Sequence, residues 1–382
     1  MDKNIVYADN AATTKLDINA FEAMKPYLLD DYGNPSQPYS FSRNPKQAID
    51  EAREIIAECI NAQPEEIFFT SGGTESDNWV LNGFGASGNK KIVITSPIEH
   101  HAVLNTCDAL NKKGSIDLFL LEVNKEGKVL IDSMKQTISS LSFDTDRVDV
   151  LTSVMLANNE IGSIQDLAEI SEEAHNAGAI VHTDAVQAIG HIPVNVKSLG
   201  IDYLSASAHK FNGPKGIGFL YKKTGISLQP YQIGGSQEHG LRAGTENVAS
   251  IVGMAVALQI NVKEIEKNIK KILHLEDLLL EDLKGIDFLH NGSKDHIPGN
   301  INLSFRNEDG ERILHRLDLM GISVSTGSAC DSVNSQLSHV IKAIKVDEEY
   351  AHGTIRISLG KYNTEEDVHV ITNCIKKIIK RD

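Results

Sequence analysis

Three short patterns in the chain combine residue types that could hold and activate a charged cofactor. Residues 70–76 (TSGGTES) form a small-residue turn that opens a predicted helix, and the free N–H groups and hydroxyls of such a turn can bind a phosphate. Asp184 follows the predicted strand 179–183, and a carboxylate at the carboxyl end of a parallel strand can pair with a protonated ring nitrogen. Lys210 ends the run 207–210 (SAHK), where small neighbours can leave its amine partly desolvated for Schiff-base chemistry.

Each pattern alone has an ordinary structural explanation, such as a helix N-cap for residues 70–76. Together they provide a phosphate site, an acid for a ring nitrogen and an amine for an aldehyde, which are the three groups that pyridoxal 5′-phosphate (PLP) needs. The sequence therefore predicts PLP as cofactor. The fourteen histidines include no HExxH motif and no ligand-spaced cluster, so we expect no metal site.

Cys330 is the cysteine whose surroundings favour chemistry. It follows residues 327–329 (GSA), a small, polar run that suits a mobile loop able to bring a thiol nucleophile to a substrate. Cys59 and Cys374 lie inside helical patterns and are expected to be structural. The four cysteines include no CxxC pair and are too few for a disulfide scaffold, which favours a reducing compartment.

Two further motifs match other enzyme classes only in part. Residues 83–88 spell GxGxxG, but a helix-like stretch precedes them and a strand follows, which is the reverse of a dinucleotide-binding site. Residues 207–210 (SxxK), 76–78 (SDN) and 223–225 (KTG) are the three elements of a serine β-lactamase site, yet their order along the chain is wrong. We interpret the glycines as a helix end and keep acyl transfer as a weak alternative.

The elements that position these residues follow an α/β rhythm. From about residue 65 to residue 221, short β-branched runs alternate with helix-like segments, which predicts a mostly parallel central sheet with helices on both faces. A long helical pattern over residues 245–283 has a charged middle and marks the expected domain boundary. The last helix is expected to be capped reciprocally by Thr364 and Asp367.

The pattern indicates two domains. We expect a large PLP-binding domain over residues 16–260. Residues 1–15 and 261–382 are expected to form a smaller α/β domain that carries the Cys330 loop.

Composition and charge limit the kinds of partner. The chain has 382 residues and a net charge of −15, which opposes direct contact with nucleic acid or an anionic membrane. Residues 1–14 lack the apolar core of a secretory signal, and the longest apolar stretch, 251–258, is far shorter than the roughly 20 residues that span a bilayer. We therefore expect a cytoplasmic protein without a membrane segment.

Ordered motifs along nearly the whole chain resemble the NifS/IscS-type cysteine desulfurases of the class V aminotransferase group. The matching motifs are ADNAATT (8–14), GNPS (33–36), TSGGTES (70–76), EHHAVL (99–104), NNEIG (158–162), DAVQ (184–187), SAHK (207–210), GGSQE (234–238), RAGTEN (242–247), STGSAC (325–330) and IRISLG (355–360).

The resemblance implies a fold, an activity and partners. The fold is that of the PLP-dependent transferases of fold type I. The activity converts L-cysteine to L-alanine and leaves a persulfide on Cys330, which passes to an acceptor protein in iron–sulfur cluster assembly or tRNA thiolation. The resemblance also implies a homodimer, in which Thr245 is lent to the partner subunit's cofactor site.

The resemblance also assigns roles to individual residues. Lys210 would bind the cofactor covalently, His100 would stack on its ring and move protons, and Cys330 would be the nucleophile. Arg356 would clamp the substrate carboxylate with help from Asn10. The remaining cofactor contacts would be Asp184 at the ring nitrogen, Gln187 and Asn159 on the ring-hydroxyl side, and Gly73, Thr74, Ser207 and His209 at the phosphate.

The chain departs from the family pattern at four positions. Tyr39 stands where a histidine is usual and Ser42 where a glycine is usual, which leaves substrate access open. Asp331 and Leu337 replace a small residue and a proline after the nucleophile, which leaves the choice of acceptor open. The alternatives are a selenocysteine lyase, another class V aminotransferase, or a non-catalytic protein that binds an assembly partner.

Overall fold

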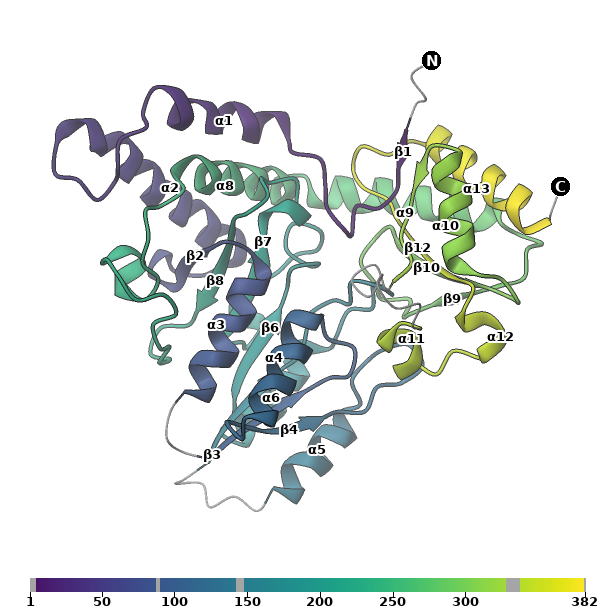
Figure 1. The fold of residues 1–382 in the computed structure, drawn as a ribbon, viewed down its shortest axis with the longest axis horizontal. Coiled ribbons are helices and arrows are strands. Elements are labelled where there is room, and N and C mark those ends of the chain that lie inside the picture. The colour runs from purple at the N-terminus through teal and green to yellow at the C-terminus, as the bar shows by residue number, and fades with distance from the viewer. Residues whose placement is uncertain (1–4, 87–89, 142–147, 328–336, 381–382) are drawn as a thin grey trace.

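The structure is a computed structural model that describes residues 5–86, 90–141, 148–327 and 337–380. Its largest element is a seven-stranded sheet (Figure 1). Strand β8 runs antiparallel to both of its neighbours, and the other neighbouring strands pair in parallel. The order across the sheet is β2 (Ile67–Thr70), β8 (Gly218–Lys222), β7 (Tyr203–Ser207), β6 (Ile180–Asp184), β5 (Val148–Ser153), β3 (Lys90–Thr95) and β4 (Asp117–Leu120).

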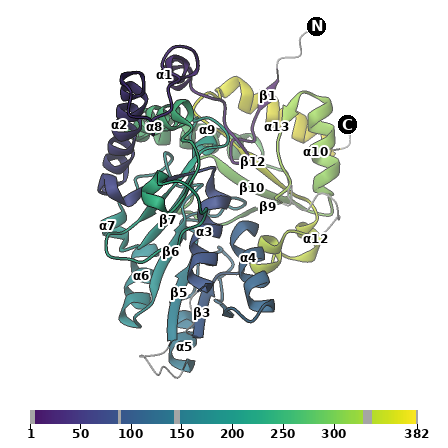
Figure 2. The ribbon, with the colours of Figure 1, turned by 60° about the vertical axis from the view of Figure 1, so that its left-hand side comes forward.

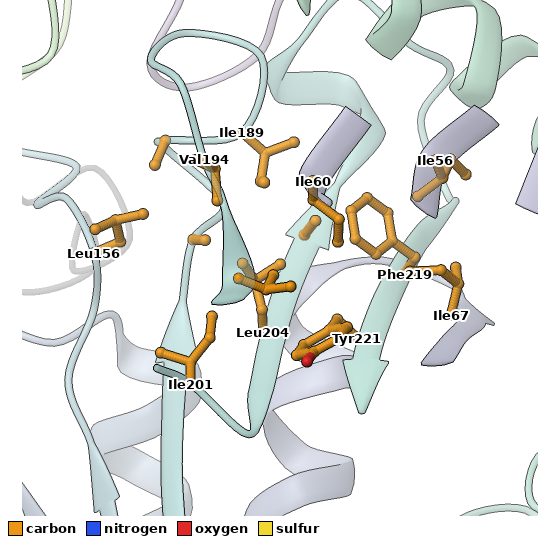
Figure 3. Close-up of a cluster of buried hydrophobic side chains, with 14 of the residues drawn as sticks. Ile56, Ile60, Ile67, Leu156, Ile189, Val194, Ile201, Leu204, Phe219 and Tyr221 are labelled. Carbon is orange, nitrogen blue, oxygen red and sulfur yellow. The ribbon is translucent and has the colours of Figure 1, made fainter. Parts of the chain in front are cut away.

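Helices cover both faces of this sheet, because its central strands are apolar on both sides. On one face, Ile56 and Ile60 of α2 pack near Phe219 and Tyr221 of β8 (Figure 3). That face is covered by α1 (Ile18–Leu29), α2 (Arg43–Ile60), α5 (Ile131–Ser140), α6 (Leu167–Asn176), α7 (Val196–Leu199) and α8 (Val248–Lys263). The opposite face is covered by α3 (Gly73–Gly85) and α4 (His101–Lys112). The predicted α/β sheet is confirmed.

A smaller α/β part lies to one side of the large sheet (Figures 1 and 2). Its antiparallel sheet has the order β12 (Thr354–Ser358), β10 (Asn300–Phe305) and β9 (Phe288–Asn291), and β1 (Val6–Tyr7) pairs in parallel with β11 (Ile322–Ser323). Its helices are α9 (Ile265–Asp282), α10 (Gly310–Leu319), α11 (His339–Ala343), α12 (Glu348–Ala351) and α13 (Glu365–Lys380). A separate apolar core joins α9, α10 and α13 to this sheet. The exact domain division stays a prediction.

The helical pattern over residues 245–283 forms two helices rather than one. Helices α8 and α9 meet at Glu264 with a bend of 71°. The bend has a packing reason, because Leu258 of α8 is buried in the core of the large sheet whereas Leu275 of α9 is buried in the core of the small part. In the described part of the chain no single helix is long and apolar enough to span a membrane, and α8 and α9 satisfy that length and composition only together, across the bend.

Several local predictions are confirmed. The Thr364 N–H donates to Asp367 Oδ2 at 3.0 Å, and the Asp367 N–H donates to Thr364 Oγ1 at 3.2 Å, which is the expected reciprocal cap of α13. Helix α3 ends at Gly85 and strand β3 follows, so the first two glycines of the GxGxxG run belong to a helix end. The last two residues of that run lie outside the described residues.

Candidate active site

A cavity of about 540 Å³ opens at the carboxyl end of the parallel strands, between the large sheet and the small part. Strands β6 and β7 lead directly into it, the first turn of α3 forms one end, and β12 and residues 11–13 close the other side. Ten of the residues expected from the sequence line this cavity. They are Gly73, Thr74, His100, Asn159, Asp184, Gln187, Ser207, His209, Lys210 and Arg356.

The first turn of α3 forms the end of the cavity that suits a phosphate. Gly72 precedes the helix with φ 153°, a conformation that favours glycine. A Cβ on Gly73 would lie 2.5 Å from Val186 Cγ2, so the turn can approach the segment after β6 only without a side chain there. The first N–H groups of a helix lack intrahelical partners and attract anions. Ser207 and His209 line the same cavity, and burial, followed by the charge of Lys210, lowers the pKa of His209 to about 4.

The Glu75 carboxylate also lies near this end, and its negative charge is paired with Arg242. Glu75 accepts hydrogen bonds from the Ser71 N–H at 2.8 Å and from Arg242 Nε at 2.9 Å. Burial alone would raise the pKa of Glu75, but these bonds hold it below its usual value. The carboxylate is therefore ionised and paired, and Arg242 offsets its charge beside the anion site.

The acid predicted at the end of β6 is buried within the cavity wall. Asp184 is 5% exposed, and its Oδ1 accepts a hydrogen bond from the Val186 N–H at 2.9 Å. Burial raises the pKa of Asp184, whereas the nearby His100 and Lys210 oppose that shift. A carboxylate held in this way is suited to pair with a protonated ring nitrogen, which would supply the missing positive charge.

Lys210 and His100 provide an amine and an imidazole in the same cavity. Lys210 lies in a short turn after β7, and its Nζ donates to the carbonyls of Ala11 and Ala12 at 2.6 and 2.9 Å. His100 is the N-cap of α4, and its Nδ1 accepts from the Ala102 N–H at 3.1 Å. Burial lowers the pKa of His100, so its ring is neutral at pH 7 and carries its proton on Nε2.

Arg356 brings a cation from the small part into the cavity. It lies on β12 and is 4% exposed. Its Nη1 donates to the Asn159 carbonyl at 2.8 Å, and its Nη2 donates to Asp9 Oδ1 at 2.7 Å. Among the described residues its Nε has no hydrogen-bond partner. A buried guanidinium with a free N–H is suited to bind a carboxylate from a ligand.

Two expected site residues in the described part of the chain, Asn10 and Thr245, do not line the cavity, and a third, Cys330, lies outside that part. Asn10 donates to the Ser358 carbonyl at 2.8 Å and to Asn363 Oδ1 at 3.2 Å, beside the cavity rather than in its wall. Thr245 is exposed and lies in the segment before α8. Cys330 lies outside the described residues, although Gly327, three residues before it, lines the cavity. Asp331 also lies outside the described residues.

Comparisons with known proteins agree along the full length. The family model described as aminotransferase class-V matches residues 6–371. Cysteine desulfurase IscS of Dictyoglomus turgidum (strain DSM 6724 / Z-1310) is 47% identical over 384 residues, covering 99% of this chain and 95% of that relative. The chain belongs to the class-V aminotransferase family.

Solved structures support the same grouping. A structure described as a NifS-like protein superposes with a TM-score of 0.91 at 37% identity and covers 99% of this chain and 100% of its own. A structure of SspA in complex with cysteine has a TM-score of 0.79 at 33% identity and covers 94% of this chain and 99% of its own. The expected family, fold type and cofactor are confirmed, and the chain is a PLP-dependent class-V enzyme.

The cavity fits PLP by its own geometry. The glycine turn of α3, the buried Asp184 carboxylate and the Lys210 amine all line it. They supply the phosphate, ring-nitrogen and aldehyde contacts that the cofactor needs.

Sequence reasoning did not identify two charged residues of the site. Asp9 pairs with Arg356, although it lies 347 positions away along the chain. Asp77 lines the cavity from α3 and was considered only within the SDN motif. The sequence could have indicated Asp77, because it lies one helical turn after Gly73 and therefore on the same face of α3.

Proposed function

We propose that this protein is a cysteine desulfurase that takes sulfur from L-cysteine, releases L-alanine and holds the sulfur on Cys330 for an acceptor. The observation that carries the proposal is the buried guanidinium of Arg356, which lines the same cavity as Lys210 and Asp184 and whose Nε has no hydrogen-bond partner among the described residues. An amino acid substrate needs this combination, because its carboxylate binds the arginine while its amino group reaches the cofactor.

The chain's own residues would hold the cofactor at three points. Lys210 would bind its aldehyde, and Asp184 would face its ring nitrogen. Bound PLP supplies an electron-withdrawing ring that stabilises negative charge developing next to the substrate's amino carbon. The remaining contacts would be Gly73, Thr74, Ser207 and His209 at the phosphate and Gln187 and Asn159 on the ring-hydroxyl side.

His100 and Lys210 are placed to move protons at the substrate. The His100 ring is neutral at pH 7, and its Nδ1 accepts the hydrogen bond from the Ala102 N–H. The other ring nitrogen, Nε2, does not take part in that bond, so it can hold or release a proton inside the cavity. The Lys210 amine, which would hold the aldehyde of the cofactor, would also be the base that takes the α-proton of the substrate.

Cys330 performs the sulfur transfer in this proposal. Its thiolate attacks the sulfur of the bound cysteine, a new S–S bond forms, and the carbon–sulfur bond of the substrate breaks. The electron pair of that bond stays on the carbon fragment, which takes up a proton and leaves as alanine. The sulfur remains on Cys330 as a persulfide, which an acceptor thiol can then attack.

Mass spectrometry of the Cys330 peptide tests this function. After incubation of the holoenzyme with L-cysteine, we expect one additional sulfur atom on Cys330 and an equal amount of alanine. Cys330→Ser should abolish sulfide release, whereas the control Cys59→Ser, a half-buried helix residue, should retain it. Parent-rate sulfide release by Cys330→Ser would contradict the persulfide mechanism and favour another class-V reaction.

We also propose a homodimer and a protein acceptor. Thr245 is exposed and does not line its own cavity in the described part of the chain, which supports its use in the partner subunit's phosphate site. Light scattering should give twice the chain mass, and a monomer would contradict this arrangement. The acceptor is an iron–sulfur scaffold or a tRNA-thiolation enzyme, and persulfide transfer from Cys330 to each purified class of acceptor would distinguish them.

A further inference from the structure

Asp77 is a fully buried carboxylate at the back of the cavity. It lies on α3 and is 1% exposed. Within the described residues neither of its oxygens accepts a hydrogen bond, which is costly for an ionised group. Donor and acceptor atoms of Asp77, His100 and Asp184 all lie within 4.8 Å of one another. Asp77 therefore lies directly beside the acid that would face the cofactor ring.

No positive group among the described residues that face Asp77 neutralises its charge. His182 Nε2 lies 3.6 Å from Asp77 Oδ1, but burial lowers the pKa of His182 to about 3, so this ring is neutral. The His182 ring is also held by Ser153 Oγ at 2.8 Å and by Ser205 Oγ at 3.1 Å. The Ser205 hydroxyl lowers the pKa of Asp77 somewhat without reaching hydrogen-bond geometry.

The other titratable groups around Asp77 oppose its ionisation or act on Asp184 instead. Burial, followed by the charge of Asp184 and then of Glu99, raises the pKa of Asp77 well above its usual range. His100 lies within 4.8 Å of both carboxyls and is neutral at pH 7, so it does not distinguish them. Asp184 differs, because its Oδ1 accepts from the Val186 N–H at 2.9 Å and Lys210 favours its charged form. Two buried carboxyls this close share one proton, and the proton resides on Asp77, which has neither a hydrogen-bond donor nor the favourable charge of Lys210.

We propose that Asp77 holds a proton and donates it in a hydrogen bond to Asp184, which keeps Asp184 as the anion that faces the ring nitrogen of the cofactor. Asp77 is a positioning residue, since it acts on the cofactor only through Asp184. This inference rests on the proposed function for the identity of the cofactor contacts, but it does not depend on sulfur transfer.

Two substitutions separate a protonated Asp77 from an ionised one. In Asp77→Asn the amide is a neutral donor of the same shape, so the pH titration of the holoprotein's visible absorbance should stay close to that of the parent. In Asp77→Leu the donor is lost, and Asp184 competes for the ring proton. That titration should shift by about one pH unit or more, and cofactor dissociation should become about tenfold faster.

The control is Asp202→Asn, which changes a buried aspartate that precedes β7 at the opposite end of the same sheet. It should leave the titration unchanged. A shift in Asp77→Asn as large as that in Asp77→Leu would overturn the proposal, because Asp77 would then be ionised. An unshifted Asp77→Leu would overturn it as well, because Asp77 would then not act on Asp184.

A second measurement does not depend on the folding of the leucine variant. The infrared spectrum of the parent holoprotein at pH 7 should contain the C=O stretch of a protonated carboxyl that is missing from Asp77→Asn. Identical spectra in this region would overturn the proposal. Neither readout requires Cys330, so failure here is distinguishable from failure of the persulfide test.

Discussion

Two arginines in this protein, the half-buried Arg53 and the buried Arg356, are paired in different ways. Arg53 of α2 donates from Nη1 and Nη2 to both carboxylate oxygens of Glu238, at 3.0 and 2.7 Å, and also donates to the Ile67 carbonyl. Glu238 in turn accepts from the Phe69 N–H at 2.9 Å. Arg356 also pairs with a carboxylate, that of Asp9, but its Nε remains without a partner among the described residues.

The difference shows which buried charges serve the fold and which serve a ligand. An ion pair away from solvent is more stable when both carboxylate oxygens are bound, as Glu238 is by Arg53, because each buried unsatisfied group retains its desolvation cost. Arg356 and Asp77 keep that cost at the cavity, where a substrate carboxylate can relieve it for Arg356 and protonation of Asp77 can relieve it for Asp77. Among the charged residues that have a buried, unpartnered atom in the described part of the chain, Asp77 and Arg356 line the cavity and Glu246 does not.

The largest expected effect is a loss of stability when the Arg53–Glu238 pair is broken. Arg53→Ala should lower the free energy of unfolding by about 3–5 kcal/mol, because Glu238 is left buried without its partner. The KM for cysteine should not change. Urea unfolding and steady-state kinetics of the same holoprotein measure both. A higher KM without loss of stability would show that Arg53 contributes to substrate binding, contrary to this prediction.

A change in the Arg356–Asp9 pair should instead affect substrate binding more than stability. Arg356→Lys should lower kcat/KM for cysteine by about 100-fold, mainly through KM, since a lysine cannot form the two-point contact with a carboxylate. The unfolding free energy should change little, because a cation still faces Asp9. An unchanged KM would show that the substrate carboxylate binds elsewhere.

Two histidines, His182 and His296, should change the pH dependence of stability in opposite directions. Because the folded-state pKa of His182 is about 3, below its unfolded value, its contribution to stability is present above about pH 6.5 and is lost as the pH falls. Between pH 6.5 and 5 the loss should be about 2 kcal/mol. Denaturant titrations at several pH values should show a smaller loss in His182→Asn. An equal slope in both proteins would contradict a neutral His182.

His296 should show the smallest effect, with the opposite sign. Burial opposes its charged form, but Glu276, which accepts from His296 Nε2 at 2.7 Å, raises the pKa of His296 above its unfolded value. Its contribution is therefore present below about pH 6.5 and is lost as the pH rises through the folded-state pKa. His296→Gln should be about 1 kcal/mol less stable than the parent at pH 6 and equal to it at pH 9. Equal stability of His296→Gln and the parent at both pH values would contradict a raised pKa for His296.

The sequence predicts those parts of the fold whose cause is local. The apolar runs of β5, β6 and β7 predict buried parallel strands, and the reciprocal cap at Thr364 and Asp367 is a contact over three residues. Asp184 and Lys210 reach one cavity because carboxyl ends of parallel strands share one edge of a sheet.

The features that sequence reasoning missed depend on tertiary contacts. The bend at Glu264 arises because α8 and α9 pack into different cores, while the hydrophobic pattern continues through both helices. The pairing of Asp9 with Arg356 joins two ends of the chain, and no spacing rule indicates it. Asp77 was considered only as part of the SDN motif of the acyl-transfer alternative, although its helical position relative to Gly73 indicates that it faces the site.

The central claim is that the Lys210 amine lies within covalent reach of the aldehyde of PLP in this cavity. Borohydride reduction of the purified holoprotein, followed by peptide mass spectrometry, tests it most directly. The account predicts one reduced pyridoxyl group, attached to Lys210. A label on a different lysine, or no label on a protein that retains its cofactor, would contradict it.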